Sequence, residues 1–153
     1  PLTLPLAGNV RECERVLLRR GISVQPPRGG LRSIQALTVR GIRLKQALHQ
    51  EGIEVIEVYP HATKVFLLSP DNPRAIPSKN KAWREHIAFL RKTVARIAPA
   101  LLDTPGLSGE ITPRSLDHWD ALLAAFTAFL HGKGQTQAVG DPHEGQIILP
   151  RLC

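Results

Sequence analysis

The chain lacks several features that would assign it to a protein class directly. Its 153 residues include two cysteines, too few for a disulfide framework, and no methionine. Its longest apolar segments, such as ALLAAFTAFL, are far shorter than the roughly 20 residues that a membrane-spanning helix needs. We therefore expect both cysteines to be reduced thiols, with Cys13 in the core, and a cytoplasmic protein with no membrane partner.

The N-terminus shows neither an initiator methionine nor an export signal. The chain begins PLTLPLAGNV, without the charged and apolar leader of a secreted protein. Processing would explain the missing methionine, and so would a segment that precedes this sequence. The length of residues 1–153 suits a single domain with its own core.

Motifs of several common enzyme classes are also missing. The chain contains no HExxH, no paired CxxC, no GxxxxGK[ST], no GxGxxG and no GxSxG. A zinc protease, a P-loop enzyme, a dinucleotide-binding enzyme and a serine hydrolase therefore receive no support.

Positive charge is concentrated in the first third of the sequence. The net charge is +7; residues 1–50 contain nine arginines and lysines against Glu12 and Glu14, so this part alone carries +7. Residues 51–153 contain equal numbers of basic and acidic side chains. A one-sided excess favours a polyanion such as nucleic acid, because each neutralised phosphate releases counterions. Solvated, arginine-rich helix faces would give the same composition.

Apolar spacing and capping residues predict five helices. The first has Asn9 as N-cap, Gly21 as its stop, and Cys13 and Leu17 on its apolar side. The five expected helices cover residues 10–20, 34–51, 61–68, 83–97 and 116–131, and those that begin after Ser33 and Ser115 end at Gly52 and Gly132.

The second helix is expected to bury one apolar stripe. The stripe consists of Ile34, Leu37, Gly41, Leu44 and Leu48. A glycine inside a helix costs about 1 kcal/mol in helix propensity. Close packing against another element would explain Gly41, and a break in the helix is the alternative.

Strands alternate with these helices, which predicts an α/β fold. The strongest candidate is 53–58, rich in branched apolar residues, and weaker ones are 22–27 and the two segments TQAV and QIIL around the turn GDPHEG. So few strands make a thin sheet for this many helices. An absent N-terminal segment would supply the remainder.

Three carboxylates are candidates for a metal site. Glu57 lies at the C-terminal end of the strongest strand, where open α/β sheets place their ligands. Asp117 and Asp120 share a face of one predicted helix, and the small residues that follow Asp120 predict its partial burial. Converging acids suit Mg²⁺ or Mn²⁺, which activates water against a phosphodiester. Alternatively, Asp117 only stabilises the helix start, and Glu57 reaches solvent or pairs with an arginine.

Five segments occur in an order that carries a family resemblance. They are RECERVLLRRGI at 11–22, LTVRGIRLKQAL at 37–48, IEVYPHAT at 56–63, DHWDALLAAFTAF at 117–129 and VGDPHEGQIILP at 139–150. Together they resemble the domain-of-unknown-function family four-two-nine, whose members are predicted nucleases with a ribonuclease-H-like fold. The resemblance implies an α/β fold with a mixed sheet flanked by helices, and a site for Mg²⁺ or Mn²⁺.

The resemblance also implies roles for individual residues. Glu57 and Asp120 match acids of the family motifs and would hold the metal, with Asp117 as a weaker candidate. Arg11, Arg40 and Tyr59 fall on other motif positions and would line the site as substrate-binding residues.

The chain also departs from the family pattern. Family members have an acid on a first strand and another before a segment like PLTLP; both would precede Pro1. Glu14 stands where an aspartate is more usual. We therefore expect an N-terminally incomplete domain, completed by a preceding segment or by a homo-oligomer.

Three functions follow from these observations. The first is a metal-dependent nuclease that hydrolyses phosphodiester bonds of nucleic acid. The second is a non-catalytic nucleic-acid-binding or adapter module on the same fold. An enzyme acting on a small phosphorylated metabolite ranks last, since no nucleotide-binding glycine motif is present.

Overall fold

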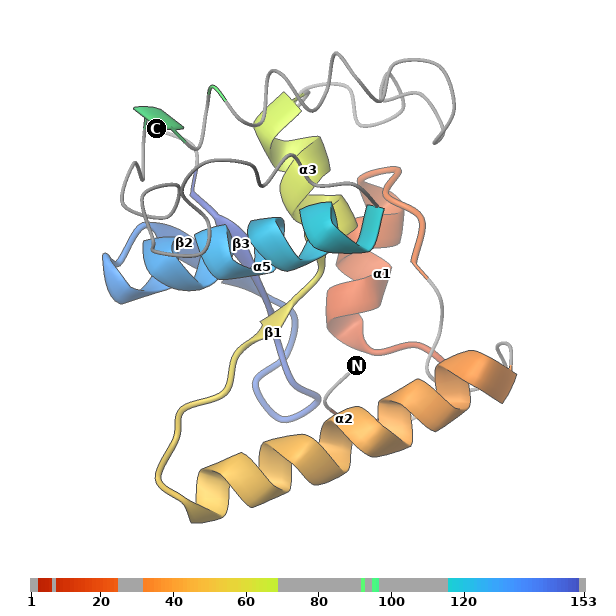
Figure 1. Cartoon of the computed structure of the whole chain (residues 1–153). Coiled ribbons are helices and arrows are strands. Elements are labelled where there is room, and N and C mark those ends of the chain that lie inside the picture. Colours follow the sequence, from red (N-terminus) through yellow and green to blue (C-terminus); the bar gives the residue numbers. More distant parts are fainter. Residues whose placement is uncertain are drawn as a thin grey trace. The chain divides into compact units, whose positions relative to one another are not determined.

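The computed structural model describes residues 3–6, 8–24, 32–68, 92, 95–96 and 116–151. It confirms a mixed α/β architecture (Figure 1). The helices are α1 (Glu12–Arg19), α2 (Arg32–Gln50), α3 (Pro60–Leu68) and α5 (Leu116–Gly132), and the strands are β1 (Glu57–Val58), β2 (Thr136–Val139) and β3 (Ile147–Pro150). Among the described residues, no helix is both long and apolar enough to cross a membrane.

The chain divides into two compact units. The first contains residues 1–57 and 138–148, and the second contains residues 58–137 and 149–153. Strands β1, β3 and β2 form one mixed sheet in that order.

The first helix begins later than its sequence predicts. Its N-cap is Arg11 in an extended conformation, so the prediction of Asn9 as the cap is wrong. Cys13 and Leu17 are fully buried, as expected. At its end Gly21 has φ +78 and donates its N–H to the Leu18 carbonyl at 2.9 Å, which confirms the predicted glycine stop.

Helix α2 runs unbroken through Gly41, so the alternative of a helix break is wrong. The predicted stripe is only partly buried, because Leu37 and Leu44 are 56% and 60% exposed. The buried residue is instead Thr38, whose hydroxyl donates to the Ile34 carbonyl at 2.9 Å. The inward face of the helix is therefore rotated away from Leu37 and Leu44, while Leu48 is half-buried.

The strongest predicted strand is mostly not a strand. Only the last two residues of 53–58 pair in the sheet, as β1, and Ile53 is 49% exposed. Residues 22–24 of the predicted strand at 22–27 are also outside any strand. The two C-terminal strands, in contrast, appear as expected at β2 and β3.

The second unit is built around helices α3 and α5, which pack together (Figure 1). The stripe of α5 is buried as predicted at Trp119, Leu123, Phe126 and Leu130. The stop after this helix is Gly134, with φ +67, and not the predicted Gly132.

The predicted helix at 83–97 lies largely outside the described residues. The three residues described there, Lys92, Ala95 and Arg96, are helical and exposed.

Candidate functional site

Among the described residues of the first unit, a group of buried charges surrounds the guanidinium of Arg11. Its two terminal nitrogens donate to the two carboxylate oxygens of Glu57, at 2.8 and 2.6 Å. This two-point geometry is the strongest that an arginine and a carboxylate adopt. The side chains are 1% and 11% exposed, so the pair is shielded from water. Pairing with an arginine, one of the alternatives for Glu57, is therefore confirmed.

The remaining N–H groups of Arg11 are also satisfied. The Nε and one terminal nitrogen donate to Glu14 at 3.0 and 2.9 Å, and the other donates to the Thr3 hydroxyl at 2.8 Å. The five N–H groups of the guanidinium therefore each have an acceptor. Glu14 also accepts from the backbone N–H of Arg11 at 2.9 Å and so closes the first turn of α1.

Burial and charge act in opposite directions on Arg11. Removal from water would lower the pKa of the guanidinium, but the hydrogen bonds and negative charge of Glu57 outweigh this effect and raise the pKa. Arg11 is therefore charged at every physiological pH.

A third carboxylate, Glu144, joins the N-terminal segment to α1. It comes from the turn GDPHEG and is 6% exposed. One oxygen accepts from the Leu6 backbone N–H at 3.0 Å, and the other accepts from that of Glu12 at 2.7 Å. Glu144 therefore caps α1 from more than a hundred residues away, a role that the sequence analysis did not predict.

Gly140 allows the same turn to approach α1. A Cβ added at this position would lie 2.5 Å from the Cβ and 2.7 Å from the backbone nitrogen of Cys13, and its φ is +107. Burial raises the pKa of the Cys13 thiol to about 11, so this cysteine is an unreactive core residue, as expected.

In the second unit, Tyr59 precedes α3 and is close enough to Asp120 to respond to its charge. Burial raises the pKa of the Tyr59 phenol, and the negative charge of Asp120 adds to this effect. The Tyr59 and His61 rings meet edge to face, with centroids 5.9 Å apart. Asp120 itself is exposed, so the expected partial burial is wrong.

The other predicted site residues are on helix surfaces. Asp117 is exposed in the first turn of α5, where it favours the helix start. Arg40 is exposed on α2. Glu57 and Arg11 belong to the first unit, while Asp117, Asp120 and Tyr59 belong to the second.

The described residues do not assemble the expected Mg²⁺ or Mn²⁺ site. No group of three histidine, cysteine, aspartate or glutamate side chains in the described part of the chain is placed to hold a metal ion. The oxygens of Glu57 accept hydrogen bonds from a buried guanidinium, whose charge opposes a second cation at the same oxygens. The arrangement therefore fits a structural ion pair better than a metal ligand.

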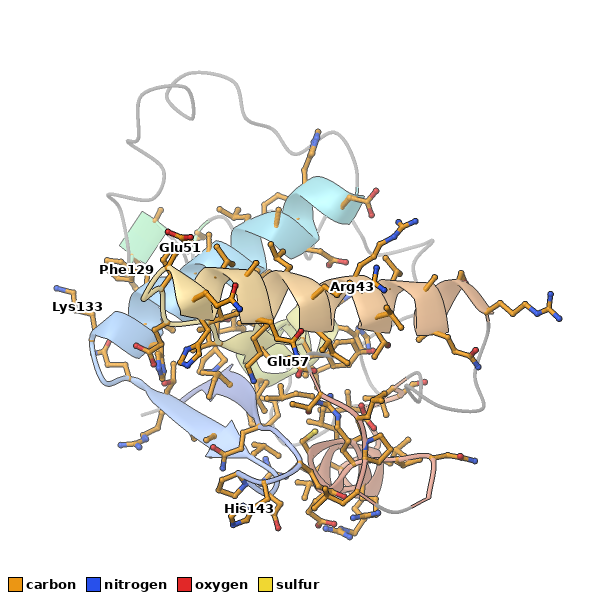
Figure 2. The ribbon with its side chains drawn as sticks, turned by 90° about the horizontal axis from the view of Figure 1, so that it is seen from below. Arg43, Glu51, Glu57, Phe129, Lys133 and His143 are labelled. Carbon is orange, nitrogen blue, oxygen red and sulfur yellow. The ribbon has the colours of Figure 1, made fainter. Side chains whose placement is uncertain are left out.

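Helix α2 has a different electrostatic character from α1. On α1, Arg15 and Arg19 each lie 2.7 Å from an oxygen of Glu12, which lowers the pKa of that carboxyl. Helix α2 contains no acid, and Arg32, Arg40 and Arg43 are all exposed on it. Figure 2 shows Arg43 on this helix, with Glu51 just past its C-terminal end.

Comparison of the chain with known protein families, curated proteins and solved structures found no match.

Proposed function

We propose that this protein binds nucleic acid. The observation that carries the proposal is the set of exposed arginines on α2. Arginines on α1 are paired with carboxylates, whereas those of α2 are exposed and have no acid on their own helix. Such a surface attracts a phosphate backbone, and the release of counterions from the nucleic acid makes binding more favourable.

Direct binding tests this proposal. The full chain is titrated against labelled single-stranded DNA, single-stranded RNA and duplex DNA at several salt concentrations, with fluorescence anisotropy as the readout. We expect affinity to fall steeply with salt, because phosphate contacts release counterions. Affinity that does not change with salt, or no binding to any of the three, would contradict the proposal.

A second candidate is the metal-dependent nuclease that the family resemblance implies, on a ribonuclease-H-like fold. One observation favours it, namely that Asp120, a residue of the matching motif DHWDAL, is exposed and lies close to Tyr59 of the motif IEVYP. Asp120 and Asp117, which share the first turns of α5, would be the acids that hold Mg²⁺ or Mn²⁺.

Cleavage assays separate the two candidates. The three nucleic acids are incubated with the full chain and Mg²⁺ or Mn²⁺, and Asp120→Asn is compared with wild type. The nuclease predicts metal-dependent cleavage that Asp120→Asn abolishes. Salt-dependent binding without cleavage would indicate a non-catalytic nucleic-acid-binding module. Unchanged cleavage by Asp120→Asn would show that Asp120 is not part of the nuclease site.

A further inference from the structure

The arginines of α2 are gathered on one side of the helix. Successive residues of an α-helix are rotated by about 100°, so Arg32, Arg40 and Arg43 fall within an arc of about 80°. We call these three residues the arginine face. All three are exposed, whereas Lys45, on the opposite side, is half-buried.

The arginine face has no acid on its own helix. Helix α2 has no acidic residue along its 19 residues, and within the described part of the chain no ion pair involves Arg40 or Arg43. Exposed arginines that are not paired lose little when they contact a new anion, because no existing ion pair has to break.

The spacing suits an extended anion better than a small one. Arg32 and Arg43 are eleven positions apart, which corresponds to about 16 Å along a helix axis with a rise of 1.5 Å per residue. A single phosphate contacts one of them, whereas a nucleic-acid backbone, with phosphates repeated along its length, contacts both.

The distribution of apolar residues argues against a membrane surface. Leu37 and Leu44 are exposed beside Arg40, but Val39, also exposed, lies beyond Arg32 on the other side of the arginine face. A helix that lies in a membrane interface has one continuous apolar face, commonly with an aromatic residue. Helix α2 has no aromatic residue, and its exposed apolar positions are divided by arginines.

We infer that the arginine face of α2 is the surface that contacts the nucleic-acid backbone. The inference rests on the proposed function and adds its location, since arginines and lysines elsewhere in the chain would otherwise be equal candidates. Contacts of this kind go to phosphates and carry no base sequence information. Binding through α2 is therefore insensitive to base sequence.

The test compares two triple variants of equal net charge. The first changes the arginine face, as Arg32→Gln, Arg40→Gln and Arg43→Gln. The control changes three exposed cations of the second unit, as Lys92→Gln, Arg96→Gln and Lys133→Gln. Each lowers the net charge by three from +7, so that overall charge cannot account for a difference between them.

We expect the arginine-face variant to bind at least about tenfold more weakly, with a salt slope reduced by about 0.7 to 0.9 for each lost phosphate contact. The control keeps the slope of wild type. A third variant, with lysine at the same three positions, keeps most of the affinity because it preserves the charge. Circular dichroism verifies that α2 is retained in each variant.

Three results would overturn the inference. Equal loss in both triple variants would show that net charge alone matters, and wild-type affinity in the arginine-face variant would place the contact elsewhere; in both cases nucleic-acid binding itself stands. Binding to vesicles of anionic phospholipid with no binding to any oligonucleotide would overturn the inference together with the proposed function.

Discussion

At the scale of single residues, the pair of Arg11 and Glu57 is the clearest feature of the first unit. Its two members, 46 positions apart in sequence, are the N-cap residue of α1 and the first residue of β1, and two hydrogen bonds join them. Removing one member of a buried pair leaves the other without compensation, which costs more than the pair itself contributes.

We therefore predict that Arg11→Met lowers the free energy of unfolding by about 3–5 kcal/mol, because Glu14 and Glu57 lose their shared partner. Glu57→Gln keeps the shape but removes the charge and lowers it by about 1.5–3 kcal/mol. Urea denaturation of both variants and of the double variant measures the coupling between the two residues. If Glu57 were instead an unpaired ligand position, Glu57→Gln would leave stability unchanged or raise it.

An exposed pair on the same helix supplies the control. Arg19 and Glu12 are 2.7 Å apart, but Arg19 is 65% exposed. Pairs in water contribute little to stability, so the same cycle with Arg19→Met and Glu12→Gln should show much weaker coupling. Similar coupling in both cycles would mean that burial does not strengthen the Arg11 pair.

At the scale of elements, the turn GDPHEG and helix α1 depend on each other. Glu144 supplies the cap and Gly140 the close approach. The N-terminus of α1 is thus completed by residues from the other end of the sequence, and its stability depends on that tertiary contact.

We predict that Gly140→Ala destabilises the protein by about 2 kcal/mol or more, because the added methyl group meets the backbone of Cys13 and φ is positive. Gly52→Ala is the matched control, since Gly52 also has a positive φ, +73, but open space around it. Thermal unfolding should rank Gly140→Ala well below Gly52→Ala. Equal losses would show that only the backbone conformation matters.

Structural features that are determined by residues close together in the sequence were predictable from it. The periodic stripe of α5 and the glycine that ends α1 both depend on residues within a few positions of each other. The cap of α1 was not predictable, since Asn9 is a favourable local cap while Glu144 is remote in sequence. Capping rules describe only the local contribution.

The strand at 53–58 shows the limit of composition as a predictor. Branched apolar residues fit a half-buried pleated surface, but a strand also needs a neighbour along its length. Its neighbour β3 is only four residues long, and β1 pairs at two. Glu57 is the first of the two residues of β1, so its predicted place at the C-terminal end of a longer strand is wrong. Its contact with Arg11 depends on how α1 packs.

At the scale of the whole molecule, the sequence shows where the positive charge is concentrated, and the structure shows which of these cations are paired. The sequence places the entire net charge of +7 within residues 1–50. The structure divides these cations into a paired set on α1 and an exposed set on α2, a distinction that composition alone does not make. Among the described cations of residues 1–50, the exposed arginines with no acid on their own helix are therefore those of α2.

Mapping of the bound surface tests the central claim most directly. Isotopically labelled full chain is titrated with a short single-stranded oligonucleotide, and backbone amide shifts are followed by NMR. The account predicts that the largest shifts occur around Arg32, Arg40 and Arg43, that they disappear at high salt, and that α5 is unaffected. Shifts confined to α3 and α5, with none on α2, would contradict it.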